Sequence, residues 1–266
     1  SLSSRLRERV AQWLSLGGDR RVMLGVRRAG RAGRVVAAVA AAALLGGAVA
    51  GCGGSAGGAG SSDAASDLSA VRTSPIAGRL AGLPAAVDGA KVVVGRPGAP
   101  RTVQVLVDPR CGACAKFEAA GGETLLELAD EGKVRIEYLL ASFLDQGGAS
   151  GSVKAVNALR ASVDAGKFAE YHAAVFASQP EGRFTDGLLL RIAERVPGLR
   201  GEAFDRAVAE GTHTGWAEGA EKAFEATGMR GTPAVLVDGK PVGAKDGSMF
   251  DAAGFARTLK EAGVAA

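Results

Sequence analysis

The sequence predicts an α/β fold in which a β-sheet is flanked by helices and a block of helices is inserted near the middle of the chain. Two observations carry this prediction. Runs rich in β-branched residues alternate with helical patterns before residue 141 and again after residue 233. Between these regions, residues 150–227 contain no strand signal and repeat apolar residues at helical spacing.

Three strands and one long helix are expected before the insertion. The Val-rich runs at 91–94 and 102–107 are separated by a Gly- and Pro-rich connection, so they are expected to form two adjacent strands. A helical pattern follows at 113–130, where Gly121-Gly122 should kink or interrupt the helix. The run at 133–140 completes a strand, helix, strand unit, whose two strands are expected to run parallel.

The second half of the pattern is mainly helical. Residues 150–227 predict about four helices, with breaks at Gln179-Pro180 and Pro197-Gly198. The chain then closes with a strand, a turn, a short strand and a helix, which are expected at 234–237, Asp238-Gly239, 241–243 and 248–261.

Charge is distributed unevenly along the 266 residues. The whole chain carries a formal net charge of +4, but residues 1–51 contain nine Arg and only two acidic residues. Residues 52–266 therefore carry a net charge of −3. No basic stripe with interleaved aromatic residues occurs there, which argues against nucleic acid as a partner. The three cysteines exclude a disulfide framework.

Residues 1–51 have the composition of an Arg-rich leader followed by an export signal. The uncharged segment 35–50 is shorter than the about 20 apolar residues that a membrane-spanning helix needs, and it is rich in Ala. This favours a signal peptide over an uncleaved membrane anchor, which stays the alternative. Residues 1–22 add Arg without an evident task, so we expect translation to begin at Met23.

The export signal ends in Val49-Ala50-Gly51-Cys52, which resembles the lipobox of bacterial lipoproteins. That resemblance implies that Cys52 is lipidated and becomes the mature N-terminus. Residues 52–80 are rich in Gly and Ser and are expected to form a flexible tether, with the folded domain at 85–266. The domain is then extracytoplasmic and anchored to the cell membrane of a bacterial envelope.

Cys111 and Cys114 form the sharpest candidate site. They follow a predicted strand and open a predicted helix, whose unpaired N–H groups and positive dipole end would stabilise a thiolate at Cys111. Cys114 lies one turn further and can attack a mixed disulfide at Cys111. Arg110 should lower the pKa of Cys111, whereas Asp108 should raise it. The pattern predicts a redox-active cysteine pair.

Other interpretations of the pair are less favoured. A zinc site needs two further ligands, whereas His172 and His213 are isolated in helical stretches and the remaining cysteine belongs to the lipobox. A structural disulfide across two residues would close a very small loop and stabilise little. The alternative from a different functional class is a copper-handling module that uses the two cysteines with one of the histidines. We therefore predict no metal ligands in the leading interpretation.

Thr232-Pro233 is a second candidate. Proline cannot donate to a strand ladder, so Pro233 belongs at the start of the strand at 234–237 or in a special turn. The residues alone leave both readings open, because only about 5–6% of X–Pro bonds are cis.

Five ordered blocks between about Val92 and Val264 resemble the DsbA-like thiol-disulfide oxidoreductases of the thioredoxin superfamily. They are GxPxAP at 95–100, DPxCxxCxxF at 108–117, FxEYHxxVF at 168–176, GxxGTP at 228–233 and DGKxVGA at 238–244. The resemblance implies a thioredoxin-like fold with a central mixed sheet. It also implies that Cys111 is the exposed nucleophile, that Cys114 is the buried resolving thiol, and that Thr232-Pro233 is a cis-Pro loop that pairs with substrate backbone. Tyr171 and His172 then serve packing or contact solvent.

These observations predict an exported, membrane-tethered thiol-disulfide oxidoreductase that acts on thiol-containing secreted or envelope proteins and is recycled by a membrane redox partner. No metal or organic cofactor is implied. Gly112-Ala113 stands where strongly oxidising members of the family carry Pro-His. Because a His there stabilises the thiolate and makes the disulfide a strong oxidant, the choice between an oxidase and a reductase or isomerase stays open.

Overall fold

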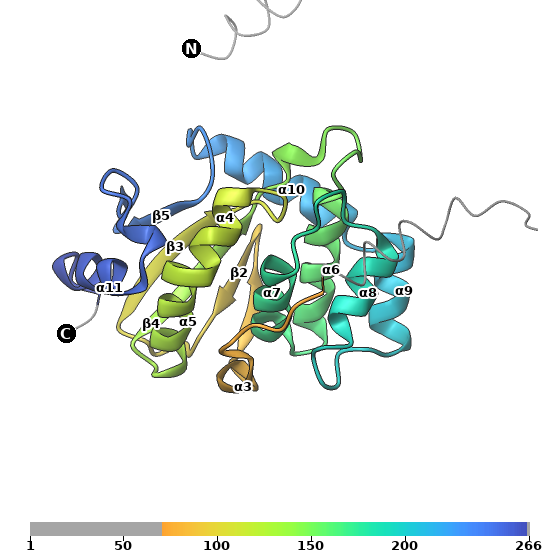
Figure 1. Ribbon diagram of the computed structural model, residues 1–266, viewed down its shortest axis with the longest axis horizontal. Helices are drawn as coiled ribbons and strands as arrows, with labels where there is room; N and C mark the ends of the chain where they lie inside the picture. Colours follow the sequence, from red (N-terminus) through yellow and green to blue (C-terminus); the bar gives the residue numbers. More distant parts are fainter. Residues whose placement is uncertain (1–70, 265–266) are drawn as a thin grey trace, which may run out of the picture. The chain divides into compact units, whose positions relative to one another are not determined.

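The computed structural model describes residues 71–264, so the predicted leader, signal peptide and lipidation site at Cys52 lie outside the described residues. Within residues 71–264 the chain forms one six-stranded mixed sheet in the order β1-β2-β4-β3-β5-β6 (Figure 1). The strands are β1 (Ala85–Asp88), β2 (Lys91–Val94), β3 (Arg101–Val107), β4 (Val134–Leu140), β5 (Ala234–Val237) and β6 (Lys240–Pro241). The predicted α/β fold with a mixed sheet and a helical insertion is confirmed.

The strand pairing confirms one prediction and corrects another. β3 and β4 run parallel, as expected for a strand, helix, strand unit, and the other neighbouring strands are antiparallel. β2 and β3, however, are not adjacent, because β4 lies between them. The connection at 95–100 therefore does not close a hairpin. β2 instead forms its hairpin with β1, an edge strand whose sequence AAVD is too short and too poor in β-branched residues to have been predicted.

Helices cover both faces of the sheet. They are α3 (Ala77–Leu80), α4 (Gly112–Phe117), α5 (Glu123–Asp130), α6 (Ser152–Asp164), α7 (Phe168–Ala177), α8 (Asp186–Ala193), α9 (Glu202–Glu210), α10 (Thr214–Ala226) and α11 (Ala252–Glu261). The insertion thus contains five helices, α6 to α10, rather than about four. The two breaks that were not predicted are at Gly166, between α6 and α7, and at Gly211, which ends α9; their φ angles of 68° and 65° are ones that glycine adopts without steric cost. None of the helices in residues 71–264 is long and apolar enough to cross a bilayer.

The central strands are buried on both faces. Val105 of β3 packs into the larger core cluster, together with Phe117, Leu126 and the side chains of α7, whereas the next residue, Leu106, packs with Phe224 of α10. Burial on both faces explains the apolar run Val105, Leu106 and Val107 at the carboxyl end of β3. In Figure 1, α4 and α5 lie in front of the sheet, and α4 begins close to the carboxyl end of β3.

The predicted helix at 113–130 is interrupted at the two glycines, as expected. A π-helical turn at Glu118–Gly122 separates α4 from α5. A Cβ atom on Gly121 would lie 2.6 Å from the backbone oxygen of Met249, and one on Gly122 would overlap the carboxylate of Glu118. The two glycines therefore allow a close backbone approach and make room for a buried acidic side chain.

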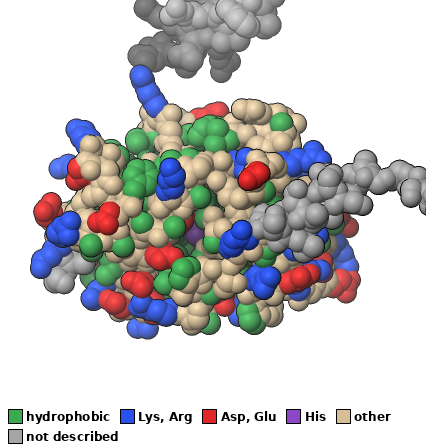
Figure 2. Space-filling view, in the orientation of Figure 1, with side chains coloured by type: hydrophobic (Ala, Val, Ile, Leu, Met, Phe, Trp, Pro, Cys, Tyr) green, Lys and Arg blue, Asp and Glu red, His purple; other side chains and the backbone are tan. Residues whose placement is uncertain are grey.

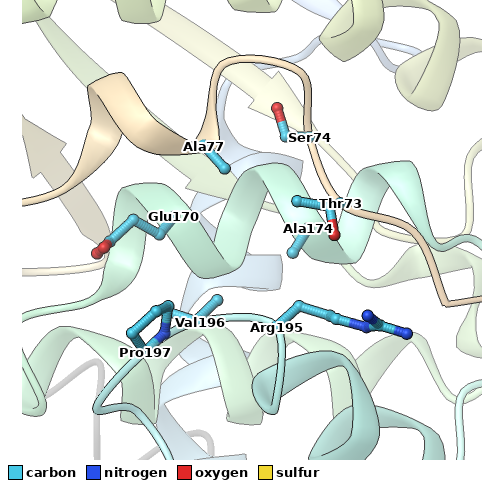
Figure 3. Close-up of a pocket in the computed structure, with 8 residues that line it drawn as sticks. All are labelled: Thr73, Ser74, Ala77, Glu170, Ala174, Arg195, Val196 and Pro197. Carbon is cyan, nitrogen blue, oxygen red and sulfur yellow. The ribbon is translucent and has the colours of Figure 1, made fainter.

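The first described residues pack onto the domain rather than belonging to the tether that the composition indicates for 52–80. Leu80 of α3 is 1% exposed, Ser74 is buried, and Arg72 is hydrogen-bonded to Ser178 at the end of α7. We call residues 71–80 the arm. Figure 3 shows the arm above α7 around a small cavity of about 30 Å³, with Thr73 and Ser74 on one side and Arg195 on the other. The packed domain therefore includes residues 71–80, ahead of the predicted start at residue 85, because apolar side chains such as Leu80 are buried in it.

Candidate redox site

Cys111 caps the N-terminus of α4, as the sequence predicts. Its backbone is extended, with φ of −74° and ψ of 114°, and its Sγ accepts a hydrogen bond from the backbone N–H of Cys114 at 3.2 Å. The backbone carbonyl of Cys111 accepts the first intrahelical bond, from Ala115. The sulfur atom therefore occupies the place of a capping oxygen, where helix N–H groups stabilise negative charge.

The two cysteines lie in different environments. Both are free thiols, but Cys111 is half-buried and Cys114 is fully buried. A hydrogen bond from the Cys114 thiol, supported by Thr232 and by backbone N–H groups, lowers the pKa of Cys111 to about 6. Burial raises the pKa of Cys114 far above its usual range. The pair thus combines an accessible thiolate with a buried neutral thiol, which supports the roles of nucleophile and resolving thiol that the resemblance implies.

The peptide bond between Thr232 and Pro233 is cis. Its loop is held against the cysteines because β5, which begins at Ala234, pairs with the end of β3. β3 leads directly into residues 108–111, which we call the cysteine turn. The thiol of Cys111 donates to the backbone carbonyl of Thr232 at 3.4 Å. The Thr232 side chain also lowers the pKa of both cysteines. The two candidate motifs, 118 residues apart at their nearest cysteine and threonine, therefore form one site.

Arg110 does not take the place that the sequence predicts for it. Its guanidinium Nη1 donates to the backbone carbonyl of Pro180 at 2.6 Å, and the interactions that lower the pKa of Cys111 come from Cys114, Thr232 and the backbone. The expectation that Arg110 tunes Cys111 stays a prediction. A guanidinium that is already bound to a neighbouring loop acts instead as a connection between that loop and the cysteine turn.

The buried side chain of Asp108 stabilises the cysteine turn through hydrogen bonds. It is fully buried, and its carboxylate accepts hydrogen bonds from the Ser152 hydroxyl and from the backbone N–H groups of Arg110 and Leu144. Burial raises the pKa of Asp108 despite these bonds. The carboxylate thus joins the end of β3 to the start of the helical insertion.

Gln179 is a site residue that the sequence did not indicate. Its side-chain amide donates to the backbone carbonyls of Pro109 at 2.7 Å and Cys111 at 3.1 Å. In the sequence, Gln179-Pro180 is visible only as a helix break. The only sequence feature that could have indicated a role in the site is a polar residue next to a Pro in a break between helices.

The structure also contains a buried polar cluster that was not predicted. Nε2 of His172, on α7, lies 3.1 Å from a carboxylate oxygen of Glu118, and both side chains are almost fully buried. The ring of Tyr138 packs against His172 with centroids 4.4 Å apart. Tyr171 is buried and donates to the carbonyl of Leu189, so the packing role expected for Tyr171 and His172 is confirmed, although Glu118 is an unforeseen partner.

The histidines do not complete a metal site with the cysteines. His172 faces Glu118, and His213 lies 3.2 Å from Asp164. Among residues 71–264, no three side chains of the metal-binding types His, Cys, Asp and Glu converge. This donor geometry does not favour the copper-handling alternative.

On the face shown in Figure 2, basic and acidic side chains are interspersed, without a basic stripe.

Comparison with known proteins identifies the family. A family model described as Thioredoxin matches residues 88–253, which is more than half of the chain. The MdbA thiol-disulfide oxidoreductases of Corynebacterium matruchotii and Corynebacterium diphtheriae are 22% and 20% identical, with TM-scores of 0.53 and 0.56; each match covers 68% of this chain and 93% of the other. Reduced DsbA from Mycobacterium tuberculosis is 23% identical with a TM-score of 0.50, and the match covers 65% of this chain and 100% of the other. At these identities the likeness concerns the fold. The chain therefore belongs to the thioredoxin family and has the fold of the DsbA-like thiol-disulfide oxidoreductases.

Proposed function

We propose that this protein is an exported, membrane-tethered thiol-disulfide oxidoreductase that oxidises thiol-containing secreted or envelope proteins. One observation carries the proposal. A half-buried Cys111 with a pKa lowered to about 6 caps a helix, beside a cis-Pro loop, with a buried thiol one turn away. This is the arrangement that dithiol-disulfide exchange requires.

The exchange runs in two steps that conserve electrons and protons. With Cys111 and Cys114 joined as a disulfide, a substrate thiolate attacks Sγ of Cys111, and the bond to Cys114 breaks. Cys114 leaves with the electron pair and takes a proton, which its raised pKa favours. A second substrate thiolate then attacks the substrate sulfur of the mixed disulfide. Cys111 leaves as a thiolate, the substrate gains one disulfide, and the protein is left with two reduced cysteines.

Thr232 would contact the substrate. While Cys111 is protonated, the Thr232 carbonyl accepts the hydrogen of its thiol. Once Cys111 is bonded to another sulfur it no longer carries that hydrogen, and the carbonyl is available to a backbone N–H of the substrate. The loop would thereby hold an extended substrate segment next to the reacting sulfur atoms.

The lowered pKa of Cys111 makes the disulfide more oxidising than that of an unperturbed thiol pair, and the reduction potential decides between an oxidase and a reductase or isomerase. A stabilised thiolate stabilises the reduced protein and makes its disulfide a stronger oxidant. Ala113 cannot supply the stabilisation that a His would supply, but Cys114, Thr232 and backbone N–H groups supply it here. The reduction potential measured against glutathione would test the direction, since about −120 mV indicates an oxidase and about −270 mV a reductase.

Membrane attachment rests on the sequence of residues 23–52. A signal segment that ends in a lipobox supports lipidation of Cys52, and a membrane redox partner would then reoxidise the reduced pair. Labelling with a radioactive fatty acid tests this proposal. We expect label on the full chain and none on Cys52→Ser. An unlabelled full chain that retains its Arg-rich leader would instead support an uncleaved anchor.

The enzymatic proposal is tested with the full chain in detergent and a reduced, unfolded substrate protein. We expect the oxidised protein to introduce disulfides and Cys111→Ser to have no activity, because the attacked sulfur is absent. A full chain that is inert but retains copper through purification would favour the binding module over the enzyme.

A further inference from the structure

The connection between α7 and α8 is hydrogen-bonded to the cysteine turn. The Gln179 amide donates to the carbonyls of Pro109 and Cys111, on either side of Arg110. Arg110 reaches back in the opposite direction, to the carbonyl of Pro180. Three hydrogen bonds thus join two short segments that are about 70 residues apart in the sequence.

The contact matters because the capping geometry of Cys111 is set by its backbone. Sγ reaches the N–H of Cys114 only while the residue keeps its extended conformation ahead of the first helical turn. The carbonyl of Cys111 already accepts the N–H of Ala115, and Gln179 uses the second lone pair of the same oxygen. A side chain that holds the carbonyls of residues 109 and 111 therefore restricts rotation of the peptide units that direct Sγ.

We propose that Gln179 is a positioning residue for Cys111, and that the arm secures the segment that carries it. This inference rests on the proposed function for its biological meaning, but its geometry concerns the reduced protein alone. Gln179 does not touch the sulfur atom. It acts through the backbone of the cysteine turn.

Gln179 is itself held between two buried neighbours. The hydroxyl of Ser178 accepts the N–H of Arg72 at 2.7 Å and donates to the carbonyl of Arg72 at 3.1 Å, which fastens the arm to the end of α7. Pro180, on the other side, is buried and accepts the hydrogen bond from Arg110. The arm, orange in Figure 1, passes along α7. The anchor of the arm and the amide that holds Cys111 thus belong to adjacent residues, Ser178 and Gln179.

The chemistry of an amide at position 179 can be separated from its size. Met has nearly the same length and no hydrogen-bond donor, so Gln179→Met removes both bonds with little change in volume. Gln104 provides a matched control, because it is half-buried on β3 and lies seven residues before Cys111. Gln104→Met makes the same chemical change away from the turn.

The test is the alkylation rate of the reduced full chain in detergent as a function of pH, which reports the pKa of Cys111 without any substrate. We expect Gln179→Met to raise this pKa by about one unit, because a turn that moves freely holds the thiolate less well against the N–H groups. The disulfide should become correspondingly less oxidising, by about 30 mV for each tenfold change in the exchange constant. Gln104→Met should match the unchanged protein in both measurements.

Gln179→Met with an unchanged pKa and an unchanged potential would overturn the proposal. Should this variant fail to fold, Gln179→Asn retains the amide but is one methylene too short to reach both carbonyls, and the same two measurements decide. Ser178→Ala tests the arm separately and should shift the pKa in the same direction by less. An unchanged value in Ser178→Ala would overturn the role of the arm. Because no substrate is used, these results are independent of whether the protein proves to be an oxidase.

Discussion

Two polar groups at opposite ends of α4 are stabilised in different ways. At the N-terminus, Cys111 is half-buried, and its sulfur atom receives hydrogen bonds from the helix backbone. Just past the C-terminus, Glu118 is almost fully buried, and its nearest partner is His172. Among the described residues, neither carboxylate oxygen of Glu118 meets the geometry of a hydrogen bond.

The difference shows which polar groups depend on tertiary structure. A helix N-terminus supplies N–H groups wherever the helix forms, so Cys111 needs no counter-ion. A carboxylate within the core has no such supply and relies on one imidazole from another helix. We therefore expect substitutions at the Cys111 end of α4 to alter thiol reactivity, and substitutions at the Glu118 end to alter the free energy of unfolding.

The largest expected effect is a loss of turnover in Cys114→Ser. The remaining Cys111 can still bond to an oxidised substrate, but no second thiol resolves the mixed disulfide. We expect the substrate to stay attached, as seen by mass on a non-reducing gel, while the thermal unfolding midpoint changes little. Turnover equal to that of the unchanged protein would show that another thiol resolves the intermediate.

At the other end of α4, His172→Ala should cost about 3–5 kcal/mol of unfolding free energy, because it leaves a buried carboxylate without its partner. Urea unfolding of the oxidised protein measures this. The control is the double variant His172→Phe with Glu118→Leu, which removes both polar groups and retains the volume. If the double variant is no more stable than His172→Ala, the loss reflects packing and not the uncompensated carboxylate.

A smaller effect is expected for Gly122→Ala, about 1–3 kcal/mol of destabilisation, since the added methyl group overlaps the Glu118 carboxylate. Gly219→Ala on α10 is the control, because no atom lies within 4 Å of a Cβ atom at that position. Equal stability of the Gly122 variant and the unchanged protein would mean that the π-helical turn yields readily.

The stabilised thiolate of Cys111 predicts a contribution to stability that depends on pH. This contribution exists in the reduced protein and not in the oxidised protein. Hydrogen bonds to the sulfur atom lower the pKa of Cys111 from 9.0 to about 6 in the folded state. The stability that this contributes is fully present above the unfolded pKa and is lost as the pH falls through the folded value. The difference in unfolding free energy between the reduced and oxidised proteins should therefore shift in favour of the reduced protein as the pH rises from about 6 to about 9. A difference that does not vary with pH would contradict a stabilised thiolate.

The smallest effect is expected at the loop that faces the cysteines. Thr232→Val removes one hydroxyl that lowers the pKa of Cys111 and keeps the shape of the side chain. The alkylation midpoint should rise by less than one unit, because Cys114 and the backbone N–H groups remain. Thr212→Val in the α9–α10 connection is the control and should leave the midpoint unchanged. A fall in the midpoint of Thr232→Val would show that the hydroxyl opposes the thiolate.

Much of the fold could be predicted because it depends on short stretches of sequence. The Val-rich runs of β2 and β5 have the predicted bounds, and Gly121-Gly122 interrupts the helix as expected. The position of the cysteine pair at the end of a strand and the start of a helix was predicted in the same way. The cis-Pro loop was expected from the resemblance to a family, because the residues alone do not favour a cis bond.

The sequence by itself determined where most of the helices and strands form and which residue can become a thiolate, since propensity, periodicity and a helix N-terminus act over a few neighbouring residues. Only the tertiary structure decided that β4 lies between β2 and β3, that Gln179 bonds to the cysteine turn, and that Glu118 meets His172. Each of these contacts joins segments far apart in the chain. Their partners are selected by the packing of whole elements, for which no local pattern exists.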